Sequence, residues 1–351
     1  MTGTLVFAVP GDIQTRTGGY LYDLKLMNAL CALGVDVRHI ALGDTFPAPT
    51  RAHATSALAQ LQSLPPEDAA LVDGLAYGAL DTDGLRDVRA PLFALVHHPL
   101  ALESGLEAGL ADAMAARERA NLALARHIFV TSPHTGGILS QHYEISPDRV
   151  TVVRPGFDPV AEIDTAAKDT PPLILSVGIL AQRKGHDILL RALSRLGDLP
   201  WQADIVGREH EPGMNARLSA QIRDLDLRER VRLSGEISDA ALESRYRRAT
   251  LFALATRYEG YGIVFGEAMA YGLPIVSTRV GAVPETVAKG AGMLVPADDP
   301  EAFAGALRRL LTDAKARETC TRASFAAGQA LAGWSDAAAL VRDRLPLSTA
   351  P

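Results

Sequence analysis

The chain has 351 residues, enough for two domains with separate cores, and 48% of its residues are apolar. The formal net charge is −6, and no basic block indicates a surface for nucleic acid or anionic lipid. Only two cysteines occur, Cys31 and Cys320, which excludes a disulfide framework and a structural zinc site. No apolar run has the length of a membrane span, so a reduced, soluble, cytoplasmic protein is the simplest expectation.

Short apolar runs alternate with helix-period segments throughout the chain. In the first half the predicted strands are 5–9, 35–42, 69–74, 92–96, 127–131 and 150–153. Segment 20–33 repeats its apolar residues at three- and four-residue steps, and Gly34 follows where a helix end favours a left-handed residue. Such strand–helix–strand units predict a parallel sheet.

A linker and a second alternating series follow. Residues 154–172 carry prolines near both ends and no sustained apolar period, as in an interdomain linker. The next predicted strands are 173–177, 203–206, 231–234, 251–254, 274–278 and 292–295. Predicted helices lie near 186–197, 214–226, 238–249, 263–272, 300–312 and 334–345. We therefore expect two doubly wound α/β domains facing each other across a cleft, with ligands beyond the carboxyl ends of the strands.

One stretch concentrates candidate binding residues. In "RYEGYGIVFGEAMAYGLPIVST", a loop follows a buried strand and leads into a helix, so Glu259 lies on the loop and Glu267 on the second helical turn. Gly260 and Gly262 leave backbone N–H groups accessible at the helix N-terminus, which favours a phosphate. Carboxylates repel phosphate but accept hydrogen bonds from hydroxyls, so a ligand combining both, such as a nucleotide sugar, fits.

The simpler interpretation is that both glutamates are ordinary surface charges. The surface-charge interpretation is less favoured for Glu267, because its neighbours in "IVFGEAMAYG" are apolar and a buried carboxylate needs a partner.

This stretch resembles the E-x7-E signature of the family 4 (group 1) retaining glycosyltransferases, enzymes of the GT-B fold. The likeness runs through "RYEGYGIVFGEAMAYGLPIVSTRVGAVPETV", and "VRLSGEISDAAL" resembles the segment that precedes it. "SVGILAQRKGHDILLRAL" is similar to the glycine-then-lysine loop that holds the donor diphosphate. "TGGY" and "VVRPGFD" match as well, so the resemblance covers essentially the whole chain.

The resemblance implies a different binding role for each domain. Residues 1–157 would form a Rossmann-like acceptor-binding domain and 158–333 a Rossmann-like domain for the nucleotide-sugar donor. Residues 334–351 would add a C-terminal helix that packs back on the first domain.

The resemblance also implies site residues. Glu267 would bind the ribose, Glu259 the hydroxyls of the donor sugar, and Lys184 with Arg183 the diphosphate. His97 would lie by the sugar at the reacting carbon, giving it and Glu259 the catalytic roles. Further donor contacts are expected from Gly18, Gly19, Ile237, Gly260, Tyr261, Gly262 and Ile263.

Two positions depart from the family pattern. Many members carry arginine directly after the glycine of the phosphate loop, where this chain has Ile179, so Arg183 is the expected substitute. The family histidine is often followed by aspartate, whereas His97 is followed by His98 and Pro99. His97 is the preferred cleft histidine, and His98 stays open.

The implied reaction moves a hexosyl group from a UDP- or GDP-sugar to a hydroxyl with retention at the anomeric carbon. No cofactor or metal is expected, because cationic side chains do the metal's work in this family. Residues 1–157 hold 11 Lys and Arg against 16 Asp and Glu, a balance of −5, which argues against stable lipid docking and favours a small soluble or oligosaccharide acceptor. A lipid-linked acceptor, a nucleotide-sugar binder and a sugar-nucleotide epimerase remain alternatives, and the oligomeric state is not indicated.

Other motifs carry less weight. "DTD" at 81–83 resembles a metal-binding D-x-D of another glycosyltransferase fold, but it lies in a polar stretch away from the predicted ligand loops. "VPET" at 283–286 suits the first turn of a helix. A glycosidase pair of glutamates would have no phosphate cradle between its members, and no G-x-S-x-G elbow supports a nucleophilic triad.

Overall fold

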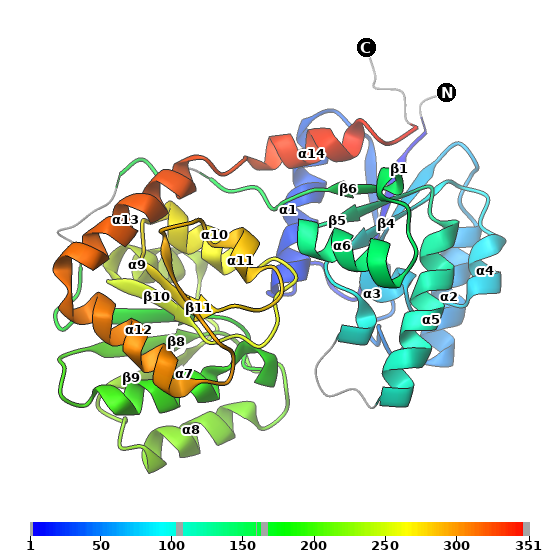
Figure 1. The fold of residues 1–351 in the computed structure, drawn as a ribbon. Coiled ribbons are helices and arrows are strands. Elements are labelled where there is room, and N and C mark those ends of the chain that lie inside the picture. Colours follow the sequence, from blue (N-terminus) through cyan, green and yellow to red (C-terminus); the bar gives the residue numbers. More distant parts are fainter. Residues whose placement is uncertain (1–2, 103–107, 159, 163–167, 347–351) are drawn as a thin grey trace. The chain divides into compact units, whose positions relative to one another are not determined.

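The structure is a computed structural model that describes residues 3–102, 108–158, 160–162 and 168–346. The chain forms two compact units, Met1–Gly156 with Ala332–Pro351 (the first unit) and Phe157–Leu331 (the second unit). Each unit contains a six-stranded parallel sheet flanked by helices (Figure 1). Of the predicted linker, residues 159 and 163–167 lie outside the described residues.

The first unit has the strand order β2-β1-β3-β4-β5-β6. Its strands are β1 (Leu5–Pro10), β2 (Val37–Leu42), β3 (Ala69–Asp73), β4 (Leu92–Val96), β5 (His127–Val130) and β6 (Val150–Val152). Its α-helices are α1 (Gly18–Ala32), α2 (Arg51–Gln62), α3 (Gly74–Tyr77), α4 (Thr82–Arg86), α5 (Ala108–Leu124), α6 (Pro133–His142) and α14 (Trp334–Arg342). The C-terminal helix α14 packs against α1, where the Trp334 and Tyr22 rings meet edge to face at 5.4 Å.

The second unit repeats this plan with the order β12-β11-β10-β7-β8-β9. Its strands are β7 (Leu173–Val177), β8 (Gln202–Val206), β9 (Val231–Gly235), β10 (Leu251–Leu254), β11 (Ile275–Thr278) and β12 (Gly292–Val295). Its α-helices are α7 (His186–Leu193), α8 (Met214–Asp224), α9 (Asp239–Arg248), α10 (Ile263–Ala270), α11 (Val283–Thr286), α12 (Pro300–Thr312) and α13 (Ala314–Gln329).

Burial on both faces explains why the central strands read as unbroken apolar runs. Ile174 of β7 enters one core cluster, whereas its neighbours Leu173 and Leu175 enter another. Parallel strands covered by helices on both sides have this pattern, and the half-buried edge strand β2 is more polar. The predicted architecture of two doubly wound α/β domains is confirmed.

Helix α13 was not predicted from the sequence. Its buried positions are Cys320, Ser324 and Gly328, small residues four apart, so it lacks the large apolar stripe that marks most surface helices. Smallness allows close packing, since a Cβ on Gly328 would lie 2.4 Å from the carbonyl oxygen of Met269 on α10. None of the helices in the described part of the chain has the length and apolarity needed to span a bilayer.

Candidate active site

In the second unit, the candidate site residues gather where the chain changes direction across the sheet. Strands β7, β8 and β9 follow one another outward, and the chain then crosses to β10 on the other side of β7. Loops at the carboxyl ends of β7 and β10 diverge at such a switch point and leave room for a ligand. Lys184 lies on the first of these loops and Glu259 on the second.

The β7–α7 loop buries its lysine. Lys184 ends a 3-10 turn, Gln182–Lys184, and is only 9% exposed. Gly185 follows with φ +64°, and a Cβ there would lie 1.9 Å from the carbonyl oxygen of Ala255. A side chain at this position would therefore push the lysine loop away from the β10 loop.

Lys184 and Glu259 form a buried ion pair. The Nζ atom of Lys184 lies 2.6 Å from Oε1 of Glu259, and Glu259 is 4% exposed. Burial alone would raise the pKa of Glu259, but the charges of Lys184 and Arg183 and hydrogen bonds from Lys184 and Thr256 lower it below its usual value. Glu259 is therefore not a solvated loop residue, and its side chain pairs with a cation.

The loop that carries Glu259 is braced by the β11–α11 segment. The backbone N–H of Ala282 donates to the carbonyl of Glu259 at 2.9 Å. Gly281 has φ +50°, and a Cβ there would lie 2.4 Å from the same carbonyl oxygen. Thr286 of α11 donates its hydroxyl to the carbonyl of Tyr261 at 2.7 Å. The "VPET" helix is confirmed, and it also supports the candidate site.

Glu267 has a different partner. The hydroxyl of Tyr246 on α9 donates to Oε2 of Glu267 at 2.6 Å, and the Tyr246 ring stacks on Tyr271 with centroids 5.2 Å apart. Burial and the neighbouring Glu267 raise the pKa of the Tyr246 hydroxyl well above its usual value. Tyr246 therefore stays protonated and fixes one oxygen of the half-buried carboxylate.

A second ion pair fixes the backbone around Arg183. The carbonyl of Arg183 accepts hydrogen bonds from the Arg257 amide at 2.7 Å and from the Thr256 hydroxyl at 3.0 Å. Arg257 also grips Asp187 with two hydrogen bonds, at 2.9 and 3.0 Å. The segment around Lys184 is thereby tied to the segment around Glu259 by backbone as well as by side chains.

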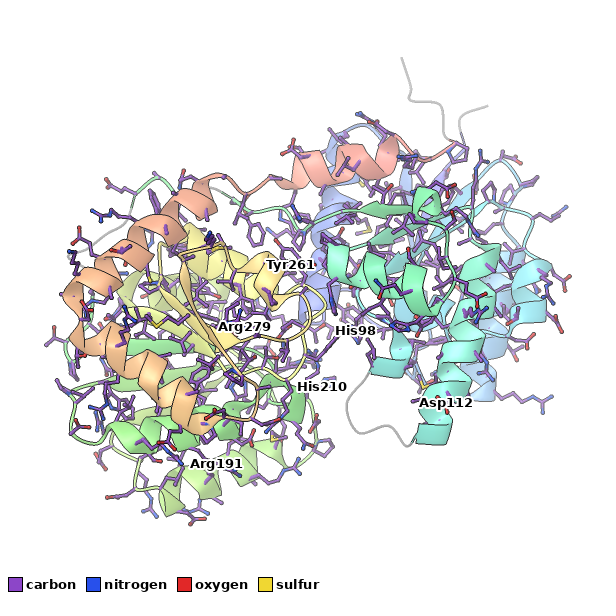
Figure 2. The ribbon with its side chains drawn as sticks, viewed as in Figure 1. His98, Asp112, Arg191, His210, Tyr261 and Arg279 are labelled. Carbon is purple, nitrogen blue, oxygen red and sulfur yellow. The ribbon has the colours of Figure 1, made fainter. Side chains whose placement is uncertain are left out.

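The remaining donor-side candidates lie on neighbouring loops. Gly262 has φ +84° and precedes the first residue of α10, Ile263, so the predicted glycine-rich helix start is present. Ile237 is half-buried between β9 and α9. Tyr261 and Arg279, labelled in Figure 2, mark the loops before α10 and after β11.

In the first unit, His97 lies directly after β4 in a buried charged cluster. Its Nε2 atom is 2.9 Å from Oδ1 of Asp23 on α1 and 3.5 Å from Oδ2 of Asp73 at the end of β3. Gly19 adjoins this ring, since a Cβ there would lie 3.5 Å from His97 Cδ2, whereas Gly18 begins α1 exposed. Burial alone would lower the pKa of His97, but the two carboxylates raise it to about 10.

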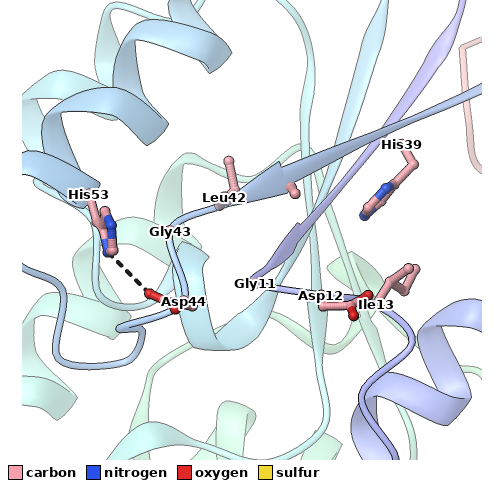
Figure 3. A pocket seen from close by; sticks show the side chains of 9 residues that line it. Gly11, Asp12, Ile13, His39, Leu42, Gly43, Asp44 and His53 are labelled. Carbon is pink, nitrogen blue, oxygen red and sulfur yellow. Dashed lines mark ion pairs between the residues drawn. The ribbon is translucent and has the colours of Figure 1, made fainter.

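A separate hollow of about 570 Å³ opens at the carboxyl ends of β1 and β2 (Figure 3). Its polar side chains come from the loop after β1, from β2, from the loop after β2 and from α2: Asp12, His39, Asp44 and His53. His53 Nδ1 lies 3.6 Å from Asp44 Oδ1, drawn as a dashed line, and 2.8 Å from the hydroxyl of Thr45. Among the described residues, neither lysine nor arginine lines this hollow.

Several side chains that contact the predicted site residues were not predicted from the sequence. Asp23, Asp73 and Tyr246 lie far along the chain from the residues they contact, and no fixed spacing links them. In the "DTD" segment, Asp81 caps α4 through the Gly84 amide and Asp83 pairs with Arg86.

Residues 161–326 match the model of the family described as Glycosyl transferases group 1. The D-inositol 3-phosphate glycosyltransferase of Thermobifida fusca (strain YX) is 32% identical over 222 residues, which are 57% of this chain and 50% of that protein. The mannosylfructose-phosphate synthase of Agrobacterium fabrum is 29% identical over 180 residues, 46% of this chain and 40% of that protein. The chain thus spans about half the length of the curated relatives it matches.

The fold is similar to solved glycosyltransferase structures. Sucrose-phosphate synthase from Thermosynechococcus elongatus has a TM-score of 0.80 over 97% of this chain and 98% of that chain, at 21% identity. This likeness establishes the fold, two Rossmann-like units of the GT-B type. The family match covers residues 161–326, which lie in the second unit.

Proposed function

We propose that this protein is a glycosyltransferase that moves a hexosyl group from a nucleoside-diphosphate sugar, UDP- or GDP-linked, to an acceptor hydroxyl. The observation that carries the proposal is the buried Lys184–Glu259 pair, 2.6 Å apart at the switch point of the second sheet. A cation and a carboxylate held together there offer one group for phosphate and one for sugar hydroxyls. The family match of residues 161–326 supports the same function.

The donor would exchange with this ion pair. Lys184, helped by Arg183, would bind the diphosphate and stabilise the charge that develops on it as the glycosidic bond breaks. Glu259 would then accept hydrogen bonds from the hydroxyls of the sugar. Glu267, oriented by the hydrogen bond from Tyr246 to one of its oxygens, would accept hydrogen bonds from the ribose hydroxyls.

The remaining donor contacts would come from backbone. The amides of Gly260, Tyr261, Gly262 and Ile263 at the start of α10 would meet the sugar and diphosphate, since a helix N-terminus favours negative charge. The backbone around Ile237 would contact the base. In the first unit, Gly18 and Gly19 would approach the phosphates and His97 the sugar.

We propose a retaining mechanism without a metal. The bond between the anomeric carbon and the phosphate oxygen breaks, and the acceptor oxygen bonds to that carbon on the same face. The departing phosphate takes the acceptor proton, so no protein nucleophile is needed. Lys184 and Arg183 supply the positive charge that a metal ion would otherwise supply.

For the acceptor, we propose a small uncharged polyol or sugar that binds at the hollow beside β1 and β2. Asp12, Asp44 and two histidines line it and would bind hydroxyls, whereas the lack of lysine or arginine among its described lining residues disfavours a phosphate. The names of both curated relatives include a phosphorylated compound, which supports a phosphorylated acceptor as the second candidate. Arg16, on the β1–α1 loop outside the lining, could serve that acceptor.

The test is product analysis with purified protein. Donors with UDP, GDP, ADP and dTDP are combined with polyols, sugars and their phosphates, and products are identified by mass spectrometry and by NMR of the anomeric proton. The proposal expects a glycoside whose anomeric configuration matches the donor, formed with the chelator EDTA present. A donor converted to an isomer without acceptor would indicate an epimerase, and binding without turnover would indicate a nucleotide-sugar binder.

A further inference from the structure

Three chain segments bring two carboxylates to one nitrogen of His97. Asp23 comes from α1, Asp73 from the end of β3 and His97 from the end of β4. The carboxylate oxygens lie 2.9 and 3.5 Å from Nε2, and the side chains of Asp23 and Asp73 are 1% and 2% exposed. Two buried acids on one ring nitrogen exceed what hydrogen bonding of a neutral imidazole requires.

The orientation of the ring is fixed from its other sides. The Tyr22 ring meets it edge to face at 5.1 Å, and the Tyr22 hydroxyl donates to the carbonyl of Val153 at 2.8 Å. The backbone carbonyl of His97 accepts hydrogen bonds from the hydroxyls of Thr131 and Thr135, at 3.2 and 3.4 Å. The imidazole is therefore held in one orientation.

The charges that face the ring favour its protonated form. The carboxylates raise the pKa of His97 to about 10 against the opposing effect of burial. Burial chiefly raises the pKa of Asp23, to about 7, so the cluster as a whole binds protons more tightly than its isolated members would. Both carboxylates contact Nε2 of His97. In the contacts of the described residues, Nδ1 is therefore the nitrogen that can bind a ligand.

We infer that Asp23 and Asp73 are positioning residues that hold His97 as an imidazolium whose Nδ1–H donates to an oxygen of the substrate. This inference rests on the proposed function for the identity of that substrate. It separates two chemical roles, because a neutral His97 with its proton on Nε2 would present a lone pair at Nδ1 and could act as a base. The imidazolium instead acts as a fixed donor and takes no proton.

The first test needs no substrate. In the full chain labelled with ¹⁵N and ¹³C at histidine, the His97 signals are assigned with a His97→Gln variant and followed from pH 5 to 10.5. We expect imidazolium shifts at pH 7.5 and a midpoint far above the ordinary histidine value. Asp23→Asn should move the midpoint down by more than one pH unit, and Asp112→Asn, an exposed change on α5, should leave it in place.

A neutral His97 at pH 7.5 in the wild type would overturn the inference, whatever the variants do. A stoichiometric divalent ion found by metal analysis would overturn it as well, because the three residues offer ligand atoms within 4.8 Å of one another. If Asp23→Asn does not fold, Asp73→Asn gives the same comparison.

The second test uses catalysis. Asp23→Asn should lower kcat about ten- to hundredfold at pH 8.5, with a smaller change in KM and partial recovery at pH 6, since acid restores the imidazolium. A pH-independent loss would contradict the inference and indicate a merely structural role. If the His97 signals titrate with the expected high midpoint but the wild type has no transfer activity, the proposed function is contradicted and the charge state of His97 is still established.

Discussion

The two units place different charge balances at the carboxyl edges of their sheets. In the second unit, one cation, Lys184, meets one carboxylate, Glu259, and the pair is neutral. In the first unit, His97 meets two carboxylates, Asp23 and Asp73. Both clusters lie at the carboxyl ends of central strands. The same type of sheet thus holds a simple ion pair in one unit and an imidazole contacted by two carboxylates in the other.

The difference indicates how each cluster can act. A neutral ion pair can give up its partners to a ligand that offers both a phosphate and hydroxyls, because the lysine then pairs with the phosphate and the carboxylate accepts hydrogen bonds from the hydroxyls. A ring held by two acids cannot exchange them without leaving a buried charge unpaired. We therefore expect the donor to reorganise the second cluster and to leave the first one intact.

The largest effect should come from Lys184→Ala. It removes the cation proposed for the diphosphate, so kcat should fall about 100- to 1,000-fold. It also leaves Glu259 buried without its counterion, which should lower the free energy of unfolding of the second unit by about 3 to 5 kcal/mol. Steady-state kinetics and urea unfolding measure the two effects.

Lys289→Ala, an exposed lysine of the same unit, is the matched control and should change neither quantity. Full activity in Lys184→Ala, in protein shown to be folded, would remove Lys184 from the mechanism.

A somewhat smaller loss is expected for Glu259→Gln. The amide still accepts a hydrogen bond but no longer compensates Lys184, and it binds sugar hydroxyls less strongly. We expect kcat to fall about 100-fold, with the affinity for the free nucleoside diphosphate changed only a few-fold. Equal losses for the nucleotide sugar and the free nucleotide would show that Glu259 does not contact the sugar.

The stability of the two units should respond to pH in opposite directions. The pKa of Glu259 is lowered in the fold, so its contribution is present above 4.5 and is lost as the pH falls through the folded pKa. The pKa of His97 is raised to about 10, so its contribution is present below 6.5 and is lost as the pH rises toward 10. The raised pKa of Asp23 acts in the same direction as that of His97.

Urea unfolding of Glu259→Gln and His97→Gln against the wild type isolates these contributions. The difference in free energy of unfolding between the wild type and Glu259→Gln should shrink on acidification, and that between the wild type and His97→Gln should shrink on alkalinisation. Differences in free energy of unfolding that do not vary with pH would contradict an ionised Glu259 and a protonated His97 in the folded protein.

The smallest effect concerns the acceptor. Asp12→Asn and Asp44→Asn should raise the KM for an uncharged polyol about three- to tenfold, since each removes one strong acceptor of a hydroxyl hydrogen bond. The same variants should improve the use of a phosphorylated acceptor by lessening repulsion. If the variants use the phosphorylated acceptor less well than the wild type, the hollow beside β1 and β2 does not select against a charged acceptor.

The strands could be predicted from the sequence because buried parallel strands are nearly continuous apolar runs. The stretch around Glu259 was identified through its two glutamates and its glycines, and that around Lys184 through the family resemblance. Gly185 and Gly281 in these stretches are positions where a Cβ would clash with neighbouring backbone. Helix α13 was missed, because its buried face consists of small residues rather than an apolar stripe.

The partners of the site residues could not be predicted in the same way. The pairing of Lys184 with Glu259 spans 75 residues, and that of Asp23 with His97 spans 74. Such contacts follow from strand order, which no local pattern encodes. The two glutamates lie on a loop and a helix as predicted. Their protein partners, Lys184 and Tyr246, were not predicted, because both carboxylates were assigned to ligand hydroxyls.

The most direct test of the central claim is titration calorimetry of UDP, GDP, ADP and dTDP with the wild type, Glu267→Gln and the exposed control Glu318→Gln. One nucleotide should bind the wild type and the control equally and Glu267→Gln at least tenfold more weakly, because the amide accepts the ribose hydrogen bonds less strongly. Binding of none of the four, or equal binding to all three proteins, would contradict a donor site built on Lys184, Glu259 and Glu267.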